Sequence, residues 1–263
     1  MGRSSGVRPL AHAAAAYLLL VLGVTPLGFY VVFPLAARWL SAHPPGSPWV
    51  AAVAGRLPQY AIYAFICFFF YVVVARPLRL RPVFGGSNSP RRTAAVAGCA
   101  LGAVLLTTPL GVWATPSAIG LLTFLITGVS EEWVFRGLLT RVVADRAGIV
   151  WAAVVVSASF ALWHWGEILF VDRQRLLSAG WFAALAADFA FGLIFTVVVW
   201  RSRSLLWGGL VHGLADWHPW LGSPRFWIQA WHVPTAVLVY GLALAGAETI
   251  RRLSPPVVPP SGT

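Results

Sequence analysis

Three short polar clusters in an otherwise apolar chain have the residue types and spacing of a hydrolytic site. They are Glu131-Glu132 with Arg136, then His164, then His212 with Asp216. Charged side chains inside an apolar run are costly, so they indicate function by default. A carboxylate and an imidazole can activate a water molecule, and further polar groups can stabilise the oxyanion of a tetrahedral intermediate. Taken together, the clusters look like a hydrolytic site in a polar cavity, with the kinds of group that peptide hydrolysis would need.

The first cluster divides into a pair and a single acid. Glu132 and Arg136 are spaced i, i+4, so they are neighbours on one helix face and can neutralise each other. Glu131 lies about 100° round the same helix and has no local partner, which suits a general base. The alternative for Glu132 and Arg136 is a buried ion pair that only fixes helix packing.

The other two clusters are ambiguous when taken alone. His164 follows Phe160 by one helical turn in an aromatic-rich stretch, where taken alone a packing histidine is the more expected interpretation. His212 and Asp216 are again spaced i, i+4. The aspartate can orient the imidazole or join it in holding an anion, a water or a metal, and the pair can also be a charge-compensated contact near a helix end.

The composition predicts an all-α polytopic membrane protein. Hydrophobic residues make up 59% of the 263 and charged residues only 10%, with a mean hydropathy of +0.76. The net charge of +11 comes from arginine alone, which we interpret as membrane orientation and not as nucleic-acid binding. We expect one integral domain, residues 1–253, followed by a disordered Pro-rich tail, residues 254–263.

About eight transmembrane helices are expected, with the site in an intramembrane cavity between them. The expected spans are 10–35, 58–75, 93–112, 118–139, 149–169, 180–200, 205–220 and 234–247. With this count, thirteen arginines fall on the side of the termini and five on the other side. The positive-inside rule therefore places both termini in the cytoplasm, in an expected bacterial plasma membrane.

Depth along these spans does not bring all three clusters together. At 1.5 Å per residue, Glu131 and His212 lie roughly 10–15 Å from the cytoplasmic ends of their spans. His164 comes out nearer the opposite side of the membrane. Either the fifth span starts elsewhere, the helices are offset, or the clusters do not form a single site.

The order of the motifs resembles the CPBP family of intramembrane proteases, which includes type II CAAX prenyl endopeptidases and bacteriocin-immunity relatives. The resemblance covers residues 128–217 and rests on Glu131-Glu132-x-x-x-Arg136, Phe160-x-x-x-His164 and His212-x-x-x-Asp216. The family has Asn or Asp at the last position of the third motif, so Asp216 is within its pattern.

The resemblance implies catalytic roles for four residues and supporting roles for three. Glu131, helped by His164, would activate water, while His212 and Asp216 would bind or polarise the scissile carbonyl. Glu132 and Arg136 would brace the first motif, with Phe160 supporting the second. A zinc ion on Glu131, His164 and His212 is the competing account, because the family has been described both as metalloproteases and as glutamate-dependent enzymes.

The expected partners are the lipid bilayer and a peptide or membrane-protein substrate, either unmodified or lipidated. Neither nucleic acid nor a particular oligomeric state is indicated. The alternative function is a non-catalytic immunity or scaffold protein of the same family. A transporter with an acidic proton relay is less favoured, because no internal repeat and no paired broken helices are seen in the sequence.

Overall fold

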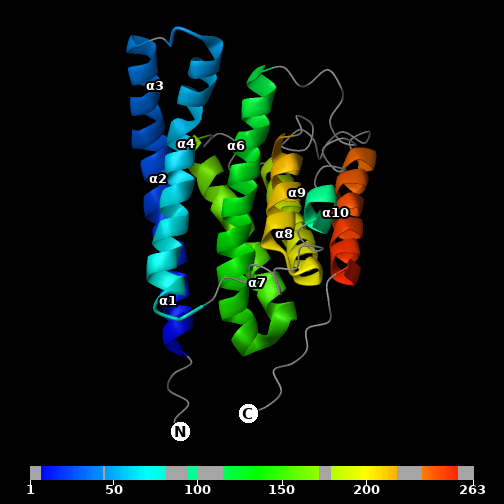
Figure 1. Cartoon of the computed structure of the whole chain (residues 1–263). Helices are drawn as coiled ribbons and strands as arrows, with labels where there is room; N and C mark the ends of the chain where they lie inside the picture. Colours follow the sequence, from blue (N-terminus) through cyan, green and yellow to red (C-terminus); the bar gives the residue numbers. More distant parts are fainter. Residues whose placement is uncertain are drawn as a thin grey trace.

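A computed structural model describes residues 7–43, 45–80, 94–99, 115–171, 179–217 and 233–253. Within these ranges the chain is helical with no strand, and the long helices run side by side as a bundle (Figure 1). The expected all-α class is confirmed. The tail, residues 254–263, and most of the third expected span lie outside the described residues.

The first helix is longer than the expected span and does not end at its prolines. It runs through α1 (Val7–Leu19), η2 (Leu20–Val24), α2 (Thr25–Leu27), η3 (Gly28–Val32) and α3 (Phe33–Ala42). Both η segments are single π-helical stretches that directly precede a proline-containing α segment. A proline removes one backbone N–H donor from the helix, and a π-turn is one way to absorb that loss.

The second helix begins ten residues before the expected start at Pro58. α4 (Pro48–Phe70) continues into η4 (Tyr71–Ala75). Its start is set by Ser47, whose hydroxyl accepts from the backbone N–H of Val50 at 3.2 Å, with proline at the first helical position. Arg56, which was assigned to a loop in the expected topology, therefore lies inside α4.

The helix with the acidic motif also continues beyond its expected end at 139. α6 (Thr115–Glu132) passes into η5 (Trp133–Leu139) and then into α7 (Thr140–Val171). Gly148 interrupts α7 with φ 81° and ψ 166°, a conformation that favours glycine. The chain reverses there, in the green hairpin at the lower end of Figure 1, and the second part of α7 packs against η5 and α8.

The C-terminal helices complete the bundle. They are α8 (Ala179–Ser202), α9 (Leu205–Trp217) and α10 (Val233–Leu253). The Ser204 hydroxyl caps α9 by accepting from the backbone N–H of Trp207 at 3.1 Å. Figure 1 shows that α1 begins and α10 ends at the same end of the bundle.

The short helix α9 is enclosed by the longer ones. It contacts α6, α8 and α10, and its residues Trp207, Val211 and Leu214 belong to one buried apolar cluster with parts of α8 and α10. At about 1.5 Å per residue, its thirteen residues reach only about 20 Å. The helix is therefore a core element, and His212 on it is buried among protein side chains.

Four described stretches are long and apolar enough to cross a membrane, namely Pro9–Ala42, Val50–Ala75, Ile119–His164 and Phe182–Ser202. The third of them contains the reversal at Gly148 and so comprises two helices. Described helices overlap every expected span, with the third represented only by residues 94–99. An integral membrane protein fits this structure, and the count of eight spans stays a prediction.

Candidate active site

The acidic motif lies at the junction of two helix types. Glu131 and Glu132 are the last two residues of α6, and η5 begins immediately after them. The π-turn is closed in part by Thr140, whose hydroxyl donates to the carbonyl oxygen of Phe135 at 2.9 Å. π-bulges inside α-helices are frequent at functional sites. Both carboxylates are buried, with exposed fractions of 4% for Glu131 and 0% for Glu132.

Glu132 and Arg136 form the expected ion pair. Arg136 Nη1 lies 3.0 Å from Glu132 Oε1, and both side chains are buried. Arg136 Nη2 also donates to the carbonyl oxygen of Gly192 on α8 at 3.3 Å. Its guanidinium carbon lies 4.4 Å from the centre of the Phe160 ring, which supports the cation from α7. The pair therefore ties the motif helix to both α7 and α8.

His212 is held against the same carboxylate. Its Nδ1 lies 2.8 Å from Glu132 Oε1, and its side chain is 1% exposed. The imidazole is enclosed by the rings of Phe160, Phe191 and Phe195, with centroid distances of 5.8, 4.7 and 5.3 Å. Glu132, expected to contact only Arg136, thus also orients the histidine of the third motif.

The other edge of the imidazole faces two more acids. His212 Nε2 lies 3.5 Å from Glu131 Oε2 and 3.4 Å from Asp216 Oδ2. The Asp216 side chain is 31% exposed. The structure thus brings Glu131, His212 and Asp216 together around one ring edge.

Tyr63 is a site residue that the motifs did not indicate. Its hydroxyl donates a 2.6 Å hydrogen bond to Glu131 Oε1 from α4. One turn before it, Gln59 and Tyr60 reach the hydroxyls of Thr127 and Thr123 on α6 at 3.2 and 2.8 Å. The only sequence signal was a polar face in an apolar span, with residues spaced i, i+1 and i+4.

His164 lies at the same depth as Glu131, which resolves the mismatch in the expected topology. Glu131 stands 17 residues before the reversal at Gly148, and His164 stands 16 residues after it. The ring contact of Phe135 with Phe160, at 5.2 Å between centroids, confirms that the two arms of the hairpin pair in this register. The mismatch arose because the motif helix continues beyond residue 139.

The ring of His164 is oriented by its own helix. Its Nδ1 lies 3.0 Å from the carbonyl oxygen of Phe160, and its ring packs 4.4 Å from that of Phe160 and 5.0 Å from that of Trp163. The Nδ1 contact leaves Nε2 as the nitrogen for other interactions. Phe160 thus contacts both histidine rings as well as Arg136.

Glycines allow α9 to approach α6 at backbone distance. A Cβ atom on Gly209 would stand 2.5 Å from the Cα atom of Val129, and one on Gly128 would stand 2.5 Å from the backbone nitrogen of Gly213. Gly209 and Gly213 have the small-xxx-small spacing of closely packed membrane helices. His212 lies between these glycines in sequence, so the close approach carries its ring to Glu132.

The expected zinc ligands do not gather as a metal site. Among the side chains that the structure describes, no group of three or more His, Cys, Asp and Glu is placed to hold a metal ion. This includes Glu131, His164 and His212. Both ring nitrogens of His212 face carboxylate oxygens instead.

Comparison with known proteins supports the resemblance drawn from the motifs. Residues 113–218 match the family model described as type II CAAX prenyl endopeptidase Rce1-like. The matched segment covers α6, η5, α7, α8 and α9, and with them all seven residues proposed from the motifs. It does not include α4 or Tyr63. No curated protein and no solved structure gives a match.

Proposed function

We propose that this chain, whose residues 113–218 match the family model described as type II CAAX prenyl endopeptidase Rce1-like, hydrolyses peptide bonds at or within the membrane. One observation carries the proposal. Glu131 is buried, one of its oxygens accepts from Tyr63 at 2.6 Å, and the other has no hydrogen-bond partner among the described residues. A carboxylate with one oxygen fixed by a hydrogen bond and the other buried beside His212 Nε2, at 3.5 Å, would be suited to accept a proton from a water molecule bound there.

The proposed reaction is general-base hydrolysis. Glu131 Oε2 takes a proton from a water molecule as the water oxygen bonds to the scissile carbonyl carbon, with His164 assisting in orienting that water. The carbon–nitrogen bond then breaks, and the proton on Glu131 passes to the departing amine nitrogen. This sequence conserves atoms and protons without any other reactant.

His212 and Asp216 are proposed to stabilise the oxyanion. An imidazole N–H can donate to the negative oxygen, and an aspartate can do so only when it is protonated. In its ionised form Asp216 would orient His212 instead. Glu132 and Arg136 are proposed to act only through His212 and through helix packing, with Phe160 supporting them.

We derive no step through zinc, because Glu131, His164 and His212 are not gathered as ligands. The proposed substrate is a peptide or membrane-protein segment, unmodified or lipidated, reached from the bilayer. The proposed location is a bacterial plasma membrane with both termini cytoplasmic. Neither nucleic acid nor a defined oligomer is part of the proposal.

The decisive experiment is cleavage of a peptide library by the purified full chain and by its Glu131→Gln variant. We expect the variant to insert and to unfold at the wild-type temperature but to lose cleavage by a factor of about 100 or more, as for removal of a general base. Asp145→Asn on α7 is the matched control, since this exposed acid lies away from Glu131. Cleavage by Glu131→Gln at the wild-type rate would end this mechanism.

A non-catalytic immunity or scaffold protein of the same family is the second candidate. It is favoured by the buried cluster of Glu132, Arg136 and His212, which would hold the helices together without any reaction. A non-catalytic protein predicts that the Glu131→Gln variant keeps the wild-type phenotype, whereas the Arg136→Ala variant fails to fold.

A further inference from the structure

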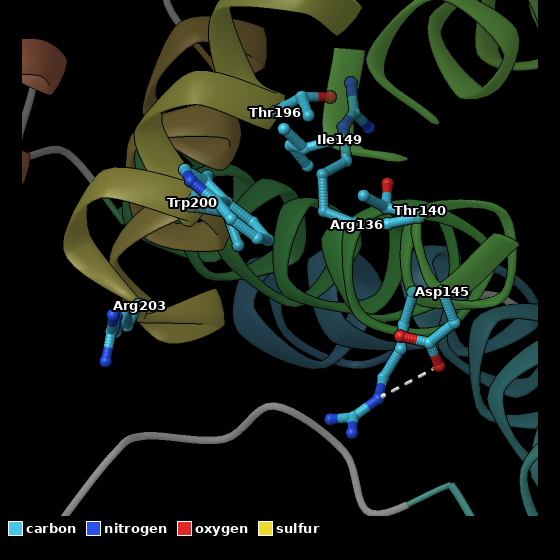
Figure 2. A pocket seen from close by; sticks show the side chains of 10 residues that line it. Arg136, Thr140, Asp145, Ile149, Thr196, Trp200 and Arg203 are labelled. Atoms are coloured by element: carbon cyan, nitrogen blue, oxygen red, sulfur yellow. Dashed lines mark ion pairs between the residues drawn. The ribbon is translucent and has the colours of Figure 1, made fainter. Parts of the chain in front are cut away.

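A second cavity lies beside the candidate active site, at the end of the bundle where α1 begins and α10 ends. Its volume is about 560 Å³, and it lies between α8 and the helical run from η5 into α7. Figure 2 shows its two walls, with Thr196, Trp200 and Arg203 on one and Arg136, Thr140 and Asp145 on the other. Nothing in the proposed hydrolysis uses this space.

The mouth of the cavity carries an excess of positive charge. Arg141 and Arg203 lie there, and Asp145 is the only acid among the described residues that line the cavity. Arg141 Nε is 3.8 Å from Asp145 Oδ2, and these side chains are 43% and 56% exposed. An exposed ion pair this long contributes little, so Arg141 is able to turn toward an anion.

Most of the cavity lining is apolar, although Arg136, Thr140 and Thr196 also line it. Val199, Trp200 and Ile149 line it between the arginines and its inner end. Thr196 on α8 stands seven residues before Arg203, which follows the end of that helix, so this wall extends roughly 10 Å from the charged mouth. Trp200 is 58% exposed, and tryptophan is typical of the level where membrane meets water. Arginines at the mouth and apolar side chains deeper in the cavity match the two parts of an anionic lipid, a charged headgroup and an apolar acyl chain.

The backbone at the mouth adds an independent observation. Arg203 adopts φ 51°, in the left-handed region, at the turn between α8 and α9. A left-handed residue commonly ends a helix, so this conformation sets where the Arg203 side chain leaves the turn.

From the charge, the apolar slot and the turn together, we propose that this cavity binds an anionic phospholipid, with the phosphate on Arg141 and Arg203 and the start of one acyl chain along Val199 and Trp200. The inner end of the cavity is formed by Arg136, the partner of Glu132. The lipid would thus lie next to the Glu132–Arg136 ion pair of the candidate active site. The inference stands whether or not the chain is a peptidase, because its test measures binding.

The test is lipid binding to the purified full chain by native mass spectrometry, with phosphatidylglycerol and phosphatidylcholine of the same acyl chains. We expect one phosphatidylglycerol retained per chain and at least tenfold weaker binding of phosphatidylcholine. The variant Arg141→Gln/Arg203→Gly should weaken phosphatidylglycerol binding by about tenfold or more, as each arginine near the headgroups contributes on the order of 1 kcal/mol.

Two matched variants separate this site from general surface charge. Arg251→Gln/Arg252→Gln removes the same charge from exposed arginines at the same end of the bundle, and should leave binding unchanged. Ala144→Phe should weaken binding without any change of charge, because it fills the cavity. Since Arg203→Gly relieves a left-handed arginine, loss of binding in that variant is not attributable to failed folding.

Three outcomes would overturn the proposal. The first is equal binding of the two lipids, and the second is an equal effect of the two double arginine variants. The third is full displacement of the lipid by millimolar glycerol phosphate, which would indicate a site for the phosphate alone and not for a lipid.

Discussion

His212 and Arg136 share a single oxygen atom. Glu132 Oε1 lies 2.8 Å from His212 Nδ1 and 3.0 Å from Arg136 Nη1. In this arrangement the carboxylate oxygen of Glu132 accepts from both partners, so Nδ1 of His212 is the donor. A neutral imidazole would then turn its Nε2 lone pair toward the oxygens of Glu131 and Asp216. These acceptor atoms repel one another unless the cluster binds one more proton. That proton is the one that would be donated in a hydrogen bond to the oxyanion.

Because Glu132 Oε1 contacts both His212 and Arg136, we predict a large loss of stability when the Glu132–Arg136 ion pair is broken. Glu132→Gln should destabilise the protein by roughly 3–5 kcal/mol, because it leaves Arg136 buried without its counter-ion. Glu132→Gln/Arg136→Met should recover part of the loss, giving a coupling energy in a double-mutant cycle. Thermal unfolding in detergent measures both, with Asp145→Asn as a control expected within about 0.5 kcal/mol of wild type. Additive effects of the two substitutions would contradict the shared-oxygen arrangement.

Tyr63 is predicted to position the base although it lies outside the segment that matches the family. Tyr63→Phe keeps the ring and removes the donor to Glu131 Oε1. We expect kcat to fall about tenfold with KM unchanged, since a hydrogen bond to a charged group contributes on the order of 1.5 kcal/mol. Tyr60→Phe is the matched control, because it removes a hydroxyl bonded to Thr123 on the same two helices. Equal losses in the two variants would show that Tyr63 acts only through packing.

Local spacing made part of this site predictable. Glu132 with Arg136 and His212 with Asp216 are i, i+4 pairs, and both contacts occur in the structure. Such contacts depend only on helical geometry, so a sequence is sufficient to propose them. The apolar runs likewise predicted the helices.

The contacts between helices were not predictable in the same way. Tyr63 reaches Glu131 over 68 positions in sequence, and Glu132 reaches His212 over 80. Both depend on which helix faces which, and on glycines whose role appears only when two backbones meet. The depth error had a local cause, because the expected span ended at 139 whereas the helix continues through η5 into α7 as far as the reversal at Gly148. The start of α4 was available from Ser47-Pro48 but was missed in favour of the later apolar run.

Asp216 is predicted to tolerate an amide better than an apolar side chain. Asn can donate to an oxyanion without first acquiring a proton. We therefore expect Asp216→Asn to keep cleavage within about tenfold of wild type, whereas Asp216→Leu should lose about a hundredfold, as for removal of an oxyanion-hole donor. Steady-state cleavage of one responsive peptide compares them. If the leucine variant were as active as the amide, Asp216 would have no role at the carbonyl.

The zinc hypothesis is predicted to fail in metal analysis. Since Glu131, His164 and His212 are not gathered as ligands, we expect well under one zinc per purified chain and no effect of a chelator on cleavage. Elemental analysis and an assay with phenanthroline test both points. One zinc per chain, lost in His164→Ala and in His212→Ala, would restore the metalloprotease account.

The approach of α6 and α9 is predicted to control whether the site forms at all. Gly209→Ala should destabilise the protein by about 1–3 kcal/mol or more, because its Cβ would overlap the backbone of Val129 and force the helices apart. Separation would also move His212 from Glu132, so cleavage should fall further than the loss of folded protein explains. Gly241→Ala on α10 is the control, since no atom lies within 4 Å of its added Cβ. Unfolding temperature and cleavage rate, measured on the same preparations, test both effects. A Gly209→Ala protein as stable and as active as Gly241→Ala would mean that the two helices do not meet at these glycines.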